Sequence, residues 1–226
     1  MSDARERLRG GLIVSVQAYA DSVLNEPDAI VLLARCAVQN GAVGLRVEGE
    51  RRIAAVRAAT AVPLVGIIKR AHAGFEPYIT STRDEIAAVA RAGATIVAFD
   101  ATGRPRADAS GVGDLVVAAH EAGLLAMADC ATLADLTAAA QAGADIVATT
   151  LAGYTQETAG RSLPALDLVG EAAKRHPFAV CEGGIGEPDA ARAAFAAGAS
   201  AVVVGTAITN VDELVRRFVR AVPRST

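Results

Sequence analysis

Lys69 and Glu182 are the two residues of this sequence best placed for acid–base chemistry, because each ends an otherwise apolar segment with the composition of a β-strand. Burying a charge there without a partner is costly, so a functional role explains these residues better than packing does. A neutral lysine removes a proton, and a protonated glutamic acid returns one. The pKa of Lys69 must then fall from about 10.4 toward roughly 7–8. Burial and the nearby cation Arg46 would both lower it.

Other polar residues stand at or near the ends of similar segments: Gln17, Arg46, Asp100, Asp129 and Thr150. In parallel α/β folds, polar residues at the carboxyl ends of strands are typical of catalytic and binding sites. For single members the alternative is a structural ion pair, such as Arg46 with Asp129, that holds the strand ends together. Arg70 follows Lys69 and should face the opposite side of its strand.

The elements that position these residues repeat along the chain. Short β-branched segments alternate with alanine-rich stretches of helical periodicity, such as 83–91 and 187–196. The alternation predicts a single-domain α/β fold, a (β/α)8 TIM barrel over residues 1–226. We expect left-handed glycines at the ends of several helices, namely Gly41, Gly93, Gly143 and Gly198. The predicted strands are 11–17, 43–48, 64–70, 95–101, 124–130, 145–151, 178–184 and 201–207.

The order of the strands assigns places around the ring. Lys69 ends the third predicted strand and Glu182 the seventh, so they should approach a central ligand from opposite sides. Inversion of a stereocentre requires an acid and a base on opposite faces of one carbon. Glycines end the last two strands, and we expect Gly183–Gly184 and Gly205–Thr206, with a short helix beginning near 206–212, to bind a phosphate through backbone N–H groups.

Composition limits the other classes of function. The formal net charge of −3, with both signs interspersed, gives no basis for a nucleic-acid or membrane partner. No apolar run reaches the roughly 18 residues of a membrane span, and the charged N-terminus lacks a signal-peptide core, so we expect a cytoplasmic protein. The histidines and cysteines do not cluster, so we expect no metal and reduced thiols. His72 and Cys130 remain open as residues that contact a substrate.

Nearly the whole chain resembles the N-acetylmannosamine-6-phosphate 2-epimerase family. The similarity rests on strings that occur in order: Gly11-Leu-Ile-Val-Ser15 with Gln17, Gly41-Ala-Val-Gly-Leu-Arg46, Gly66-Ile-Ile-Lys-Arg70, Tyr78-Ile-Thr80, Asp100-Ala-Thr102 with Arg104 and Arg106, Met127-Ala-Asp129, Thr149-Thr-Leu151 with Gly153-Tyr-Thr155, Glu182-Gly183, and Val204-Gly205 with Ala207-Ile-Thr209.

The resemblance implies interconversion of N-acetylmannosamine 6-phosphate and N-acetylglucosamine 6-phosphate, in amino-sugar or sialic-acid catabolism, without metal or organic cofactor. It implies that Lys69 and Glu182 are the catalytic pair. Substrate contacts would come from Gln17, Arg46, Asp129, Thr150 and Tyr154, and phosphate contacts from Gly183, Gly184, Gly205 and Thr206. A homodimer is one assembly that the sequence leaves open.

Two positions depart from the family pattern. Gly184 and Asn210 stand where we expect arginines, which removes positive charge near the presumed phosphate. Each lost charge-assisted contact weakens binding by about 1.5–3 kcal/mol unless another group replaces it. Backbone amides, Arg46, Arg104 or Arg161 are the candidates for that replacement. These two departures bear on which sugar phosphate is bound more than on which reaction is catalysed.

Two other functions remain open. A Schiff-base aldolase or lyase acting on a phosphorylated sugar would use Lys69 as its nucleophile. A non-catalytic phosphosugar-binding barrel would keep the site and lose turnover. The changes at Gly184 and Asn210 allow a binding protein, whereas the presence of both Lys69 and Glu182 argues against it.

Overall fold

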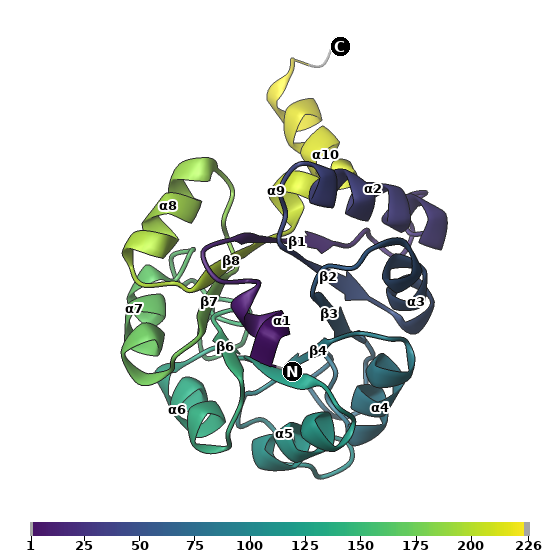
Figure 1. The fold of residues 1–226 in the computed structure, drawn as a ribbon. Coiled ribbons are helices and arrows are strands. Elements are labelled where there is room, and N and C mark those ends of the chain that lie inside the picture. The colour runs from purple at the N-terminus through teal and green to yellow at the C-terminus, as the bar shows by residue number, and fades with distance from the viewer. Residues whose placement is uncertain (1, 224–226) are drawn as a thin grey trace.

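Eight parallel strands close into a ring in the computed structural model, which describes residues 2–223 (Figure 1). Each strand pairs with its neighbours in the sequence, and β8 returns to pair with β1, where Leu12 lies beside Val202. The predicted (β/α)8 barrel is therefore confirmed. The strands are β1 (Leu12–Val16), β2 (Gly44–Glu48), β3 (Leu64–Ile67), β4 (Ile96–Asp100), β5 (Leu125–Asp129), β6 (Ile146–Ala148), β7 (Ala179–Glu182) and β8 (Ala201–Val204).

Helices surround the ring and close its amino-terminal end. The helix α1 (Ser2–Glu6) crosses that end, and Leu8 behind it is fully buried (Figure 1). After β8, the short α9 (Thr206–Thr209) leads into α10 (Val211–Ala221), which projects away from the barrel. The helices after the first seven strands are α2 (Pro27–Gln39), α3 (Glu50–Ala59), α4 (Arg83–Arg91), α5 (Val112–Glu121), α6 (Leu133–Gln141), α7 (Leu166–Arg175) and α8 (Pro188–Ala196).

Local sequence signals define the helix ends. Thr82 begins α4 by accepting a hydrogen bond from the backbone of Glu85, and Thr132 with Asp135 forms a capping box at the start of α6. Such caps satisfy N–H groups that a helix leaves without partners. The predicted left-handed glycines are confirmed: φ is +98° at Gly41, +89° at Gly93, +86° at Gly143 and +108° at Gly198.

The core has two layers because alternate residues of a strand face opposite sides of the sheet. On β3, Val65 and Ile67 belong to the cluster that fills the barrel, while Leu64 packs outward against the helices. Gly66 also faces outward, and a Cβ there would lie 2.6 Å from a Val89 methyl group, so glycine allows the close approach of α4. No helix of residues 2–223 is both long and apolar enough to span a bilayer.

Several strands end earlier than the sequence predicts, and β3 matters most for the site. It stops at Ile67, two residues before Lys69. Lys69 instead pairs with Ile79 in a hairpin, because the next backbone groups bond within it: Arg70 N–H donates to Tyr78 and Thr80 N–H to Ile68. Lys69 therefore stands on an arm above the barrel mouth, on the same side as the other strand ends. The helix predicted at 83–91 is α4, and that at 187–196 matches α8 within one residue.

Candidate active site

A cavity of about 560 Å³ opens at the carboxyl ends of the strands. Its wall is built from residues on, or directly after, β1, β2, β3, β6, β7 and β8, together with the first turns of α10. The site residues predicted from the sequence that line it are Gln17, Arg46, Lys69, Thr150, Tyr154, Glu182, Gly183, Gly184, Gly205 and Thr206. Asp129 is fully buried and bonded to Arg46, outside the lining residues.

A buried guanidinium joins two carboxylates at one side of the cavity. Arg46, which is 1% exposed, donates to both carboxylate oxygens of Asp129 at 3.1 and 2.6 Å. The same guanidinium donates to Glu182 Oε2 at 3.0 Å. Burial alone would lower the pKa of Arg46, but the Asp129 and Glu182 carboxylates outweigh it and raise the pKa. Arg46 is therefore a permanent cation, and its pairing with Asp129, the alternative that the sequence left open, is present.

Glu182 is poised to exchange a proton near neutral pH. Burial raises its pKa to about 7, although Arg46 opposes the rise. The Thr150 hydroxyl lies 2.7 Å from Asp129 Oδ1 and 3.1 Å from Glu182 Oε2. A hydroxyl carries one proton, so it donates to one of these oxygens and accepts from the other only when that carboxyl is protonated. The contact therefore suits a Glu182 that cycles between acid and carboxylate.

Lys69 reaches the cavity from the hairpin arm. Its Nζ donates to Gln17 Oε1 at 2.5 Å, and Gln17 Nε2 donates to Ser15 Oγ at 2.5 Å. Burial, assisted by the positive charge of Arg46, lowers the pKa of Lys69, in the direction that the sequence analysis requires. Part of the side chain stays open to solvent, so a ligand in the cavity can reach the amine.

Lys69 and Glu182 can hold one exchangeable proton between them in two ways. With Arg46 and Asp129 ionised, the four groups are neutral overall in two arrangements: Lys69 ammonium with Glu182 carboxylate, or Lys69 amine with Glu182 acid. A general acid–base pair occupies these two states before and after it passes a proton through a substrate. The shifts bring both pKa values closer to neutrality from opposite sides.

Glycines shape the other end of the cavity. Gly183 and Gly184 have φ of +104° and +72°, which side chains rarely adopt. A Cβ at position 184 would clash with Leu163 Cβ and lie 3.2 Å from the Leu163 carbonyl carbon. An arginine at this position, expected from the family pattern, therefore needs a different path of this loop.

Replacing Gly184 by alanine should lower the free energy of unfolding by about 1–3 kcal/mol, since it adds left-handed strain to the clash with Leu163. Gly186→Ala is the matched control, because a Cβ there meets nothing within 4 Å and φ is not positive. That control should change stability by less than about 0.5 kcal/mol. Denaturant unfolding of both variants measures the difference, and equal stabilities would show that the loop relaxes freely.

Of the three arginines named as candidates to replace the missing positive charge, Arg46 lines the cavity, whereas Arg104 and Arg161 do not. Arg104 pairs with Asp100 at 2.6 Å and with Glu76 at 3.0 Å, after β4. Arg161 pairs with Asp167 on the outer side of the barrel. Neither of these two candidates therefore replaces the charge, because nearer carboxylates hold each guanidinium. Asp100, noted among the polar strand ends, serves this structural pairing.

His72 and Cys130 also have structural surroundings. His72 lies 3.1 Å from the buried carboxylate of Glu85, which also accepts from the Ser81 backbone and lies 3.8 Å from Arg70, so Glu85 anchors the hairpin that carries Lys69. Cys130 is fully buried with its thiol toward a backbone carbonyl. Neither residue lines the cavity. Within residues 2–223, no three His, Cys, Asp or Glu side chains are grouped as metal ligands are.

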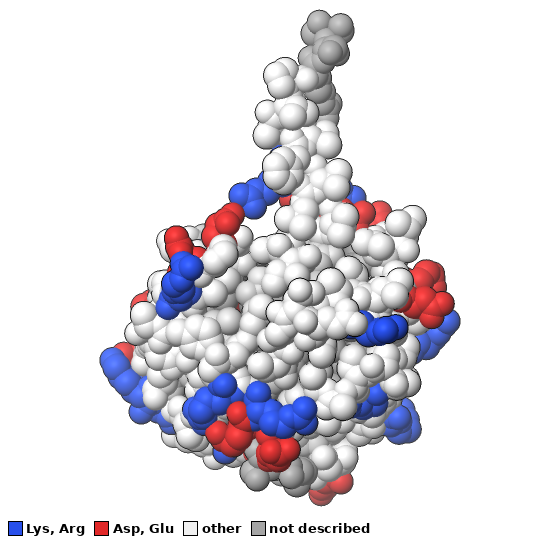
Figure 2. All heavy atoms as spheres, turned by 45° about the horizontal axis from the view of Figure 1, so that its top comes forward, with Lys and Arg blue, Asp and Glu red and all other residues white. Residues whose placement is uncertain are grey.

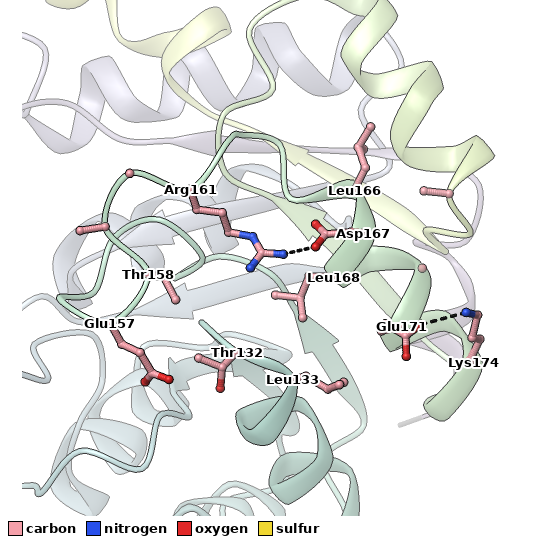
Figure 3. Close-up of a pocket in the computed structure, with 14 residues that line it drawn as sticks. Thr132, Leu133, Glu157, Thr158, Arg161, Leu166, Asp167, Leu168, Glu171 and Lys174 are labelled. Atoms are coloured by element: carbon pink, nitrogen blue, oxygen red, sulfur yellow. Dashed lines mark hydrogen bonds and ion pairs between the residues drawn. The ribbon is translucent and has the colours of Figure 1, made fainter.

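A second groove lies outside the barrel, between the segment after β6, the start of α6 and the helix α7 (Figure 3). Its volume of about 910 Å³ exceeds that of the cavity at the strand ends. Both of its cations pair with its own acids, however: Arg161 with Asp167, and Lys174 with Glu171 at 2.8 Å. It holds none of the acid–base groups described above, so the smaller cavity is the candidate active site.

Sequence reasoning missed several residues of the wall, among them Ser15, Tyr78 and Arg217. Ser15 could have been found, because it stands two residues before Gln17 and so shares its face of the strand. Tyr78 depends on the hairpin that folds back over Lys69. Arg217 depends on the direction of α10, which no local signal gives.

Comparison with known proteins identifies the family. The model of the family described as "Putative N-acetylmannosamine-6-phosphate epimerase" matches residues 30–224. Curated relatives of that 2-epimerase name include one from Synechococcus elongatus, 47% identical over 95% of this chain and 94% of its own, and one from Yersinia pestis, 41% identical over 98% and 94%. The solved N-acetylmannosamine-6-phosphate 2-epimerase of Clostridium perfringens superposes with a TM-score of 0.92 at 36% identity, over 96% of this chain and 95% of its own. The chain belongs to the N-acetylmannosamine-6-phosphate epimerase family.

Proposed function

We propose that this protein interconverts N-acetylmannosamine 6-phosphate and N-acetylglucosamine 6-phosphate by removing and returning the proton at carbon 2. The observation that carries the proposal is the placement of both groups at one cavity: Glu182 ends β7, and Lys69 lies on the hairpin that follows β3, four strands away in the ring. Their pKa values are shifted in opposite directions, as an acid–base pair working near neutral pH requires. Membership of the family supports the choice of substrate.

The reaction begins with the open-chain sugar, because carbon 2 becomes acidic only when carbon 1 is an aldehyde. In one direction the Lys69 amine takes the carbon 2 proton, and the electron pair forms an enolate across carbons 1 and 2. The Glu182 acid then protonates carbon 2 on its other face, and the aldehyde reforms. Lys69 ends as an ammonium and Glu182 as a carboxylate, so the reverse direction starts from that arrangement.

Other side chains prepare these two groups. Gln17 holds the Lys69 amine, while Arg46 and Thr150 orient the Glu182 carboxyl. The charge of Arg46 also offsets the carboxylate that Glu182 becomes after it gives up its proton. Burial, with Glu182 nearby, raises the pKa of Tyr154, so its hydroxyl stays protonated and can donate to a sugar oxygen.

The phosphate is assigned to the glycine end of the cavity, against Gly183–Gly184 and Gly205–Thr206. The absence of a Cβ at these glycines lets backbone N–H groups approach an anion closely. Fixing the sugar at this end keeps carbon 2 between Lys69 and Glu182 in both halves of the reaction.

Incubation of the purified protein with each epimer separately, in the presence of a chelator, tests the proposed activity. Proton NMR should show both samples reaching the same mixture of the two sugar phosphates. The outcome that contradicts the proposal is that neither sugar is converted while both bind.

The lowered pKa of Lys69 also fits a nucleophilic amine, so a Schiff-base aldolase or lyase is the second candidate. Borohydride added during turnover would trap a substrate covalently on Lys69 in that case. The proposed epimerase forms no such adduct. Binding without exchange of the carbon 2 proton would indicate a phosphosugar-binding protein instead.

We also propose a homodimer, in which the apolar face of α10 packs against a second copy. Val211, Val215 and Phe218 lie along one side of this helix and are 42%, 54% and 73% exposed, and Val222, directly after its end, is 58% exposed. Figure 2 shows the helix standing out from the body with a largely uncharged surface in view. An apolar face on a projecting helix is typical of an interface, and a second copy offers the same face in return.

Replacing Phe218 by glutamate should raise the dimer dissociation constant by about 30-fold or more, as removal of a central aromatic anchor does. Light scattering should give the wild-type chain a molar mass near twice 22.9 kDa. Val23→Glu, at an 88% exposed position outside α10, should remain dimeric. A monomeric wild type, or a Phe218→Glu protein that dimerises normally, would rule out this interface.

We further infer a cytoplasmic location. All three cysteines are free thiols, the form that a reducing compartment maintains. Burial raises the pKa of Cys130 and brings that of Cys181 to about 11, so both stay protonated and unreactive.

A further inference from the structure

One flank of α10 forms part of the cavity wall. Asn210, Glu213, Leu214 and Arg217 line the cavity together. Their spacing of three, four and seven residues places them on one side of a helix. This flank lies beside the apolar face proposed for dimer contact, so the two roles do not compete for the same side chains.

Arg217 is the cation of this wall that makes only a weak ion pair and has no part in the proposed proton transfer. The described lining residues include three cations, of which Arg46 is bound to two carboxylates and Lys69 is the proposed acid–base group. Arg217 lies 3.8 Å from Glu187, and both side chains are mostly exposed, at 65% and 71%. An exposed ion pair of this length contributes little stability, so the guanidinium can turn toward a better anion.

Its position is at the glycine end. Glu187 follows the segment Gly183–Gly186, which lines the cavity, so the contact with Glu187 places Arg217 beside that segment. Glu213, the acid on this flank of α10, is held by Arg220 at 2.6 Å. Glu187 is therefore the acid with which Arg217 pairs, and at 3.8 Å it does not hold the guanidinium at hydrogen-bond distance.

We propose that Arg217 leaves Glu187 and binds the phosphate of the substrate, as the side-chain cation of the phosphate site. The proposal rests on the proposed function, which assigns the phosphate to the glycine end. A guanidinium binds two phosphate oxygens at once, which backbone N–H groups at a turn complement without replacing. Arg217 would then select phosphorylated sugars over free sugars without taking part in proton transfer.

Kinetics of Arg217→Gln test this role. The KM for N-acetylmannosamine 6-phosphate should rise about 10- to 100-fold, as loss of a hydrogen bond to a charged group predicts, with kcat changed far less. The inhibition constant for inorganic phosphate should rise by a similar factor. For Arg217→Lys, both constants should lie between those of wild type and those of Arg217→Gln, because lysine keeps the charge and loses the bidentate contact. KM and phosphate inhibition both within twofold of wild type would overturn the proposal.

Arg192→Gln is the matched control. It removes one positive charge from the neighbouring α8, where Arg192 is exposed, pairs with Asp189 and lies outside the cavity wall. Its KM and phosphate inhibition should equal those of wild type, so a similar rise there would attribute the effect to net charge and overturn the assignment. Light scattering on Arg217→Gln should give the wild-type molar mass, which excludes an effect through assembly.

Calorimetric titration with inorganic phosphate separates this proposal from the proposed function. If the wild-type protein binds phosphate and Arg217→Gln binds it at least tenfold more weakly, Arg217 is an anion ligand even if no sugar is epimerised. If the protein epimerises the sugar phosphate but the two titrations agree, the function stands and the role of Arg217 is wrong.

Discussion

Alanine in place of Lys69 should abolish epimerisation, lowering kcat by about 10²–10⁴-fold or more, because a positioned general base contributes that much. Glu182→Gln should cause a loss of the same order, since glutamine keeps the shape and cannot give up a proton. Conversion followed by NMR measures both. Turnover near the wild-type rate in either variant would end the assignment for that residue.

The Glu182→Gln protein also tests whether the pKa of the Glu182 carboxyl is raised as the structure indicates. A folded-state pKa of about 7, against 4.5 for the ordinary group, means that the folded protein holds this proton more tightly than the unfolded chain. The associated stability is present below pH 4.5 and is lost as the pH rises to about 7. The stability of Glu182→Gln relative to wild type should therefore increase between about pH 4.5 and 7. If the stabilities of wild type and Glu182→Gln depend on pH in the same way, the pKa of Glu182 is not raised in the folded protein.

Removal of the Arg46 charge should have the largest effect on stability. Arg46→Met leaves Asp129 and Glu182 without their shared cation, and breaking a buried ion pair from one side costs about 3–5 kcal/mol. Chemical denaturation measures this cost. Activity should fall as well, because the Glu182 carboxyl loses the group that orients it.

A double variant shows that the cost comes from an unpaired charge. Arg46→Met with Asp129→Asn removes the fully buried carboxylate along with its partner, so it should be more stable than Arg46→Met alone. Asparagine can still bond to Thr150. A double variant that is less stable by the sum of both single effects would argue that Arg46 contributes by packing.

The barrel and the convergence of the site could be predicted because both follow from periodic features. Alternation of strand and helix fixes a parallel sheet, and parallel strands bring their carboxyl ends to one side. Lys69 and Glu182 therefore meet at one cavity although 113 positions separate them in the sequence. The shift expected for Lys69 was visible from its apolar segment and from Arg46. The rise in the pKa of Glu182 was not, because it depends on how deeply the folded chain buries that carboxyl.

The charges around the proposed phosphate site could not be placed from the sequence. Arg104 forms an ion pair with Asp100, four residues away in the sequence. Arg161 does the same with Asp167, six residues away. Such local pairing competes with any ligand and depends on loop paths that no periodicity specifies. Arg217 reaches the cavity only because α10 leaves the barrel next to β1 (Figure 1). The early end of β3, before Lys69, was equally hidden from the sequence. The backbone groups directly after Ile67 form hydrogen bonds within the hairpin and not with the neighbouring barrel strands.

Deuterium incorporation at carbon 2 tests the central claim most directly. N-acetylmannosamine 6-phosphate is incubated with the protein in D₂O, and the reaction is stopped early for NMR at carbon 2. The two-group mechanism predicts that the first N-acetylglucosamine 6-phosphate formed carries deuterium at carbon 2, because Glu182 delivers a proton that has exchanged with solvent. The remaining substrate should still carry its original proton. Product that retains the original carbon 2 proton in full would contradict deprotonation by Lys69 with reprotonation by Glu182.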